Sequence, residues 1–191
     1  PDEIRKVFDR ELDTRICADF PKINPAQIAI DPGLPKEKHM RWAALLRHQT
    51  PEEAVAILRQ LKLDNDTISK AKILVQWWKR PIGADQTQIR KTMSQMVPEL
   101  YDDLLVLKAS VGEMELQAEE CVEDLDWVKA QSGEIRQRGD CVSLKELAVT
   151  GADLIQAGMK PGKELGETLK RLLELVLEHP EWNTKEILKK V

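Results

Sequence analysis

Apolar residues recur at steps of three and four along most of the chain, which is the spacing of one face of an α-helix. The pattern starts within residues 2–19, and its first stripe consists of Ile4, Val7, Phe8, Leu12 and Ile16. Pro21 follows this stripe. Because proline cannot continue a helix interior, we predict a first amphipathic helix that ends before Pro21.

The same spacing, combined with helix-start signals, predicts a series of further helices. Their approximate ranges are 38–48, 51–61, 66–79, 85–96, 98–111 and 113–137. The start at Pro51 is the clearest, because Thr50 can cap the first turn and Glu53 can complete a capping box. Two later start signals are the capping-box spacing of Ser143 with Glu146 and the N-T-K-E run at 183–186.

No segment alternates between apolar and polar residues as a half-buried strand does. We therefore predict an all-α fold, an irregular helical bundle followed by a smaller helical tail. The charge pattern reverses and glycines appear near residues 133–142. On this basis the body is predicted to span residues 1–135 and the tail residues 136–191.

The tail contains a glycine-framed turn that resembles the turn of a helix-hairpin-helix. A short helix is expected to end at Gly158 and a longer one to begin near Gly162, with Pro161 fixing the entry and Lys160 and Lys163 beside it. The free N–H groups and positive dipole of a helix N-terminus attract anions such as phosphodiesters. An alternative is that the glycines at 158, 162 and 166 only let two helices pack closely.

Composition restricts the class of protein further. The 191 residues are 42% hydrophobic and 32% charged but only 4% aromatic, as expected for amphipathic helices in water. No apolar run approaches the roughly 20 residues of a membrane span, so we expect a cytoplasmic protein without a membrane partner. Cys17, Cys121 and Cys141 are far apart, which argues against a disulfide framework or a zinc knuckle.

The net charge is −4, but basic and acidic residues are unevenly distributed along the sequence. Residues 36–91 contain twelve basic and six acidic residues, whereas residues 99–126 contain ten acidic residues and one lysine. The first segment could attract phosphate and the second would repel it. Both could equally be solvated helix faces.

Candidate catalytic chemistry is missing from the sequence. No phosphate-binding loop of the G-x-x-x-x-G-K-[ST] type and no G-x-G-x-x-G fingerprint occurs, and the three histidines do not have metal-ligand spacing. We therefore predict no catalytic and no metal-binding residues. Trp77 and Trp78, which precede Lys79 and Arg80, could stack on bases. Packing of one ring in the core, with the other half-buried beside it, is the simpler interpretation.

Two segments resemble a known family. Residues 147–188 match the pattern G-x-D-L-I-x-x-G-x-x-P-G-x-x-[IL]-G-x-x-L, followed by a leucine-rich helix and N-T-K-E. This segment resembles the C-terminal end of bacterial class II tRNA nucleotidyltransferases, the CCA-adding enzymes, and of their poly(A) polymerase relatives. Residues 41–65 resemble part of the helical body of the same family, although R-H-Q at 47–49 lacks the Asp of the His-Asp motif that some relatives carry.

The resemblance implies that this chain is the helical body and tail of such an enzyme. Nucleotide addition, Mg²⁺ and CTP or ATP would belong to an N-terminal head and neck outside this sequence, and no cofactor is implied here. The tail would hold the acceptor and TΨC region of tRNA by backbone contacts. The expected phosphate-binding residues are Lys160, Gly162, Lys163, Arg136 and Arg138.

Other functions remain open from the sequence. A poly(A) polymerase of the same family would carry the same tail. A helical protein–protein adaptor would use the acidic segment and the tryptophans for a protein partner, and a helix-hairpin-helix module would bind DNA.

Overall fold

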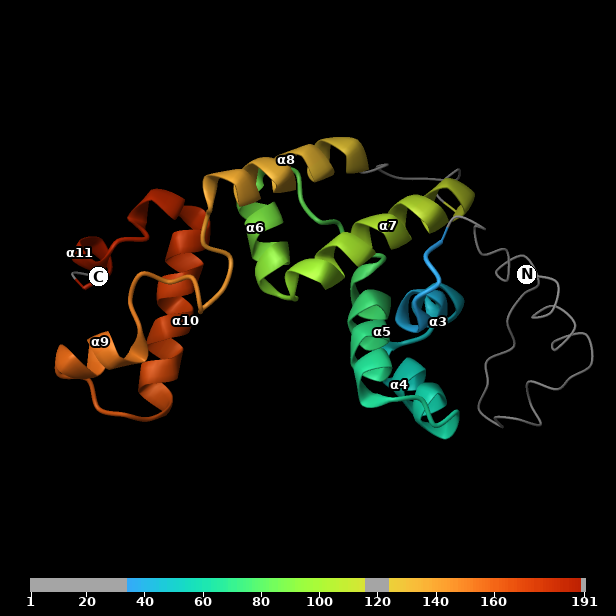
Figure 1. The fold of residues 1–191 in the computed structure, drawn as a ribbon, viewed down its shortest axis with the longest axis horizontal. Helices are drawn as coiled ribbons and strands as arrows, with labels where there is room; N and C mark the ends of the chain where they lie inside the picture. The colour runs from blue at the N-terminus through green and yellow to red at the C-terminus, as the bar shows by residue number, and fades with distance from the viewer. Residues whose placement is uncertain (1–33, 116–123, 190–191) are drawn as a thin grey trace, which may run out of the picture. The chain divides into compact units, whose positions relative to one another are not determined.

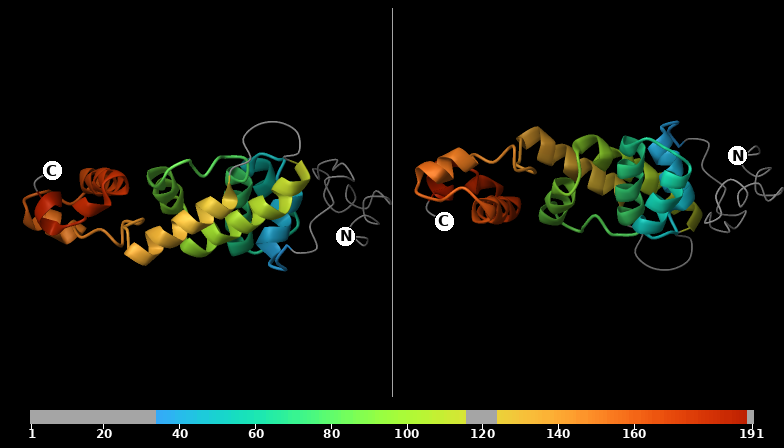
Figure 2. Two further views of the ribbon diagram at one scale, coloured as in Figure 1. Left: turned by 90° about the horizontal axis from the view of Figure 1, so that it is seen from above. Right: turned by 90° about the horizontal axis from the view of Figure 1, so that it is seen from below.

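A computed structural model describes residues 34–115 and 124–189 of the chain, and the regular secondary structure in these residues is helical, with no strand (Figures 1 and 2). The predicted all-α class is therefore confirmed. The expected helix at 2–19 and two of the cysteines, Cys17 and Cys121, lie outside the described residues.

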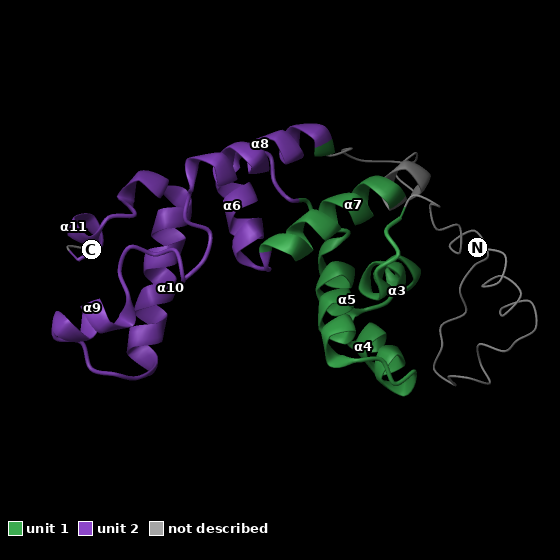
Figure 3. Ribbon diagram, viewed as in Figure 1, with its two compact units in different colours: residues 1–81, 98–125 green, residues 82–97, 126–191 purple. Residues whose placement is uncertain are grey.

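The chain forms two compact units (Figure 3). Unit 1 comprises residues 1–81 and 98–125, and unit 2 comprises residues 82–97 and 126–191. The described helices of unit 1 are α3 (Lys38–Leu46), α4 (Pro51–Gln60), α5 (Asn65–Trp77) and α7 (Pro98–Glu115). Those of unit 2 are α6 (Gln86–Ser94), α8 (Leu125–Arg138), α9 (Gly151–Gln156), α10 (Lys163–Glu178), η2 (Pro180–Trp182) and α11 (Lys185–Leu188). The predicted boundary between residues 135 and 136 stays a prediction.

Local start signals explain several helix N-termini. Thr50 accepts a hydrogen bond from the Glu53 N–H at 3.2 Å while Glu53 accepts one from the Thr50 N–H at 2.9 Å, which confirms the predicted capping box. Asp64 and Asp85 cap α5 and α6 through the N–H groups three residues on. These hydrogen bonds lower the pKa of Asp64 and of Glu53.

Unit 1 buries the apolar faces that the spacing predicted. Its fully buried side chains include Met40, Leu46, Ile57, Leu58, Leu74, Tyr101 and Leu104. Trp78 is buried and its Nε1–H donates to the carbonyl of Arg47, while Trp77 is half-buried with the Arg80 guanidinium 5.2 Å from its ring centre. This arrangement confirms the packing interpretation of the two tryptophans.

Two predicted elements are wrong. The helix expected over 113–137 is not continuous, because α7 extends through Gly112 to Glu115 and Asp124 lies outside any helix. A helical glycine costs only about 1 kcal/mol, which the buried face of α7 outweighs. The Ser143 signal starts no helix either. Glu146 accepts from the N–H of Val142 at 2.9 Å instead of that of Ser143, and residues 143–146 form a turn.

Unit 2 has its own hydrophobic core on one side of α10. The buried members are Cys141, Leu147, Val149, Leu154, Leu172, Val176 and Leu188. Burial raises the pKa of the Cys141 thiol to about 11, which keeps it in the unreactive protonated form. On its other side α10 is exposed and polar over its N-terminal turns, whereas Leu177 near its C-terminal end is buried.

Candidate functional site

The turn between α9 and α10 begins with a left-handed glycine, as the sequence predicted. Gly158 has φ +105°, its N–H donates to the carbonyl of Ile155 at 3.0 Å, and the Met159 N–H donates to that of Leu154 at 3.0 Å. These two bonds are the Schellman arrangement that closes a helix. Met159 also packs against the unit 2 core that contains Leu154, so the turn is fixed at its first end.

The second end of the turn leaves the start of α10 open. Gly162 is the residue before the helix, has φ +155° and supplies no side chain to cap the first turn. The first N–H groups of an α-helix have no intrahelical acceptor and carry its partial positive charge. Gly162 and Pro161 are exposed, so an anion can reach these groups from solvent.

The glycines of the turn do not serve close helix packing. A Cβ at Gly158, Gly162 or Gly166 would meet no other atom within 4 Å. The position where α9 approaches α10 is Gly151 instead, where a Cβ would lie 3.4 Å from a methyl of Leu165. The packing alternative therefore fails for the three glycines, and at 158 and 162 the positive φ explains the choice of residue.

The two lysines of the turn are exposed. Lys160 has no ion-pair or hydrogen-bond partner for its ammonium among the described residues. Lys163 is 92% exposed, and its Nζ lies 3.5 Å from Oε1 of Glu167 one helical turn further on. An exposed pair of this kind contributes little in water. Both ammonium groups can therefore turn toward an incoming anion.

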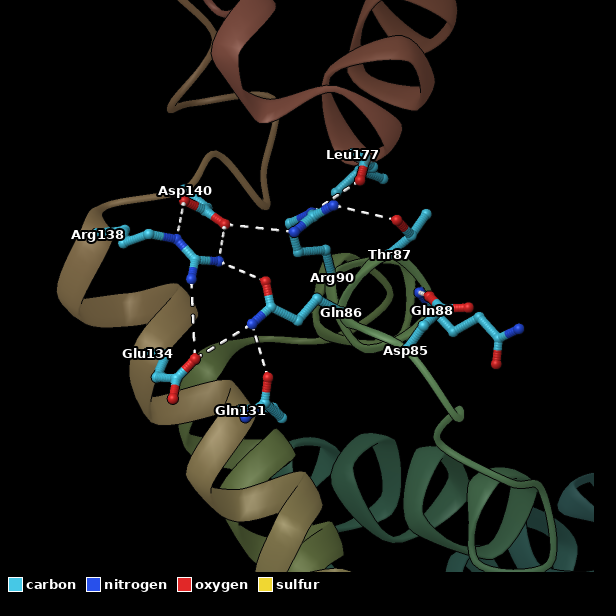
Figure 4. Close-up of polar contacts among 10 residues, drawn as sticks. All are labelled: Asp85, Gln86, Thr87, Gln88, Arg90, Gln131, Glu134, Arg138, Asp140 and Leu177. Atoms are coloured by element: carbon cyan, nitrogen blue, oxygen red, sulfur yellow. Dashed lines mark hydrogen bonds and ion pairs between the residues drawn. The ribbon is translucent and has the colours of Figure 1, made fainter.

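Arg138 lies in a different environment, a polar cluster that joins α6, α8 and the end of α10 (Figure 4). Its guanidinium donates to Oδ2 of Asp140 at 2.8 Å and to Oε1 of Gln86 at 2.8 Å. The hydrogen bond to Asp140 raises the pKa of Arg138. The side chain is 45% exposed, so one edge still faces solvent. Arg136 is exposed on the same last turn of α8.

The predicted phosphate-binding residues consequently form two groups at opposite ends of α10. Asp140 is also bound by Arg90, whose Nε donates to the Leu177 carbonyl near the C-terminus of α10 at 2.7 Å. Lys163 is the first residue of the same sixteen-residue helix. At 1.5 Å per residue, the two ends are about 20 Å apart. The turn brings together Lys160, Gly162 and Lys163, and it does not include Arg136 or Arg138.

A capping box that was not predicted from the sequence starts α9, the helix before the turn. Thr150 accepts from the Asp153 N–H at 3.3 Å, and Asp153 accepts from the Thr150 N–H at 2.9 Å and from Lys185 of α11 at 3.0 Å. Hydrogen bonds from Thr150, followed by Lys185, hold the pKa of Asp153 well below its ordinary value. The signal is T-x-x-D, with Asp in the place usually taken by Glu or Gln.

Other candidate chemistry is limited in the part of the chain that the structure describes. His39 pairs with Asp103 at 2.7 Å, and His179 stacks on Trp182 with ring centres 4.1 Å apart. In the same residues no three His, Cys, Asp or Glu side chains gather as metal ligands would. None of the described helices combines the length and apolar character of a membrane span.

A family model described as tRNA nucleotidyltransferase domain 2 matches residues 35–191, well over half of the chain and all of the site described above. No curated protein and no solved structure matches the chain significantly.

Proposed function

The chain belongs to the tRNA nucleotidyltransferase domain 2 family, and from this membership we propose that it binds tRNA through the turn between α9 and α10. The observation that supports the turn is the exposed, uncapped N-terminus of α10 with Lys160 and Lys163 beside it. Backbone N–H groups and ammonium groups together suit a phosphate of the RNA backbone.

In this proposal the tRNA is held by its shape and backbone, with little base readout. The contacts go to the acceptor and TΨC region, as in the family that the sequence resembles. Positioning contacts of this kind carry no sequence information. Nucleotide addition with Mg²⁺ and CTP or ATP is assigned by the resemblance to a catalytic head, and we propose no catalytic step for the residues of this chain.

The test measures the salt dependence of tRNA binding by fluorescence anisotropy of a labelled, folded tRNA transcript. The double variant Lys160→Ala/Lys163→Ala is compared with the wild type between 50 and 200 mM KCl. Losing two phosphate contacts makes the negative slope of log K against log salt less steep by about 1.8. Over that fourfold salt range, the factor by which affinity falls is therefore about ten times larger for the wild type than for the variant.

A matched control is Lys129→Ala/Lys145→Ala. Both lysines are exposed in unit 2 and have no side-chain partner among the described residues, so this variant removes the same charge elsewhere. Its slope is expected to stay within about 0.5 of the wild type. Equal slopes for the two double variants would contradict a specific role for the turn. Equal affinity for tRNA and for duplex DNA of the same length would favour a general nucleic-acid binder instead.

A further inference from the structure

Gly166 occupies a position in α10 where nothing in the described protein calls for a glycine. It is the fourth residue of a sixteen-residue helix and is exposed. Its φ is not in the left-handed region, and apart from its chain neighbours and the backbone of its own helix a Cβ there would meet no atom within 4 Å. Glycine is the least favourable residue for a helix interior after proline, and alanine would be tolerated sterically. The glycine therefore weakens the helix without a gain inside the chain.

The surroundings of Gly166 indicate what approaches it. Lys163 precedes it by three residues and Lys170 follows it by four, so both lie on the same helix face as the glycine. Lys170 is exposed, and its ammonium has no partner among the described residues. The two lysines are about 10 Å apart along the helix axis, so each can contact a different phosphate. Glu167, the residue after Gly166, makes only a weak exposed ion pair with Lys163, at 3.5 Å.

We propose that the sugar–phosphate backbone of the bound RNA continues from the turn along this face, with its closest approach at Gly166 and a further phosphate contact from Lys170. The inference rests on the proposed function. A missing side chain lets a foreign backbone come close to a helix, which is the known use of glycine at such contacts. The RNA site then extends over two further turns of α10.

The decisive variant is Gly166→Ala, because the proposal predicts opposite effects on stability and on binding. Without RNA, the added methyl group meets open space and favours the helix, so Tm rises by about 2–4 °C. In the complex the methyl group enters a close contact, and overpacking of this kind weakens the Kd for folded tRNA by about 5- to 100-fold.

Gly133→Ala is the matched control. Gly133 lies inside α8, is exposed, and also leaves open space around a Cβ. Its Tm is expected to rise similarly while the tRNA Kd stays unchanged. Lys170→Ala is expected to lower the salt slope by about 0.9, with Lys129→Ala on α8 as its control. All variants are made in the 191-residue chain.

The outcomes separate this inference from the proposed function. If Lys160→Ala/Lys163→Ala lowers the salt slope while Gly166→Ala binds tRNA like the wild type, the contact at Gly166 is refuted and the turn stands. A lower Tm for Gly166→Ala would refute the open space on which the inference depends. If the double lysine variant changes nothing, the proposed function fails first. Weaker binding with a raised Tm, seen for Gly166→Ala and not for Gly133→Ala, supports the contact.

Discussion

Among the polar residues of unit 2, Arg90 is expected to cost the most stability when it is replaced by alanine. The variant tests how much the contact of Arg90 with the C-terminal end of α10 contributes to the fold. The side chain is only 4% exposed. Its guanidinium donates to the Leu177 carbonyl at 2.7 Å, to Oγ1 of Thr87 at 3.1 Å and to Oδ2 of Asp140 at 3.4 Å (Figure 4). It therefore joins α6, the segment after α8 and the C-terminal end of α10.

The expected cost of Arg90→Ala follows from what the variant leaves behind. The Leu177 carbonyl is among the last four of α10, which have no intrahelical donor. An unsatisfied buried acceptor costs about 1–3 kcal/mol, and breaking a buried ion pair costs about 3–5 kcal/mol. Asp140 keeps Arg138 as a partner, which reduces the second penalty. We expect a loss of about 3 kcal/mol in the free energy of unfolding.

The assay is urea unfolding of the 191-residue chain, followed by circular dichroism. Arg138→Ala is the control, because it removes a guanidinium from the same carboxylate at a site that is 45% exposed. A half-exposed pair contributes about 1 kcal/mol or less. Arg90→Lys keeps the charge but lacks the planar fork that reaches three acceptors, so it should recover only part of the loss. Equal losses for Arg90→Ala and Arg138→Ala would refute the reasoning.

Three further outcomes follow from single contacts. Lys62 has φ +57° at the end of α4, so Lys62→Gly should raise the free energy of unfolding by about 0.5–1 kcal/mol in urea titrations. Hydrogen bonds, first from Thr150, lower the pKa of Asp153 below its ordinary value of 3.8. The ionised carboxylate therefore stabilises the fold at pH values above 3.8, and this stabilisation is lost as the pH falls from 3.8 toward the lowered pKa. Asp153→Asn should therefore unfold more easily at pH 7 and lose less stability on acidification, measured as urea midpoints from pH 6 to 2. Glu167→Gln removes the acid beside the turn and should tighten tRNA binding about twofold at 100 mM salt, whereas Asp126→Asn on α8 should not. An unchanged Kd for Glu167→Gln would mean that this acid does not oppose the RNA.

Short-range interactions made much of the fold predictable. The caps at Thr50 and Asp85 and the left-handed Gly158 depend on partners three to five residues away, which the sequence shows directly. The helix start predicted at Ser143 is wrong because of long-range contacts. Asn183 bonds the Glu146 carbonyl and the Ala148 N–H, which holds that segment as a turn against the end of the chain. No local pattern carries this information.

The grouping of α6 with unit 2 could not be predicted from the sequence either, because it depends on long-range contacts. Arg90 and Leu177 are 87 positions apart, and so are Lys91 and Glu178, which pair at 2.7 Å. In a sequence, both arginine and lysine look like members of a basic surface segment. In the structure Arg90 is instead buried and bonded to the Leu177 carbonyl of α10.

The two ends of α10 differ in what they can offer a phosphate. At the C-terminal end, Arg138 is bound to Asp140 at 2.8 Å, so a phosphate would replace one anion with another and gain little free energy. At the N-terminal end, Lys160 has no partner among the described residues, and Lys163 gives up only a weak exposed pair with Glu167. The full charge of the turn is therefore available for binding. The sequence already placed Lys160, Gly162 and Lys163 at the phosphates and gave Arg136 and Arg138 an assisting role, and the close partner of Arg138 in the fold agrees with that order.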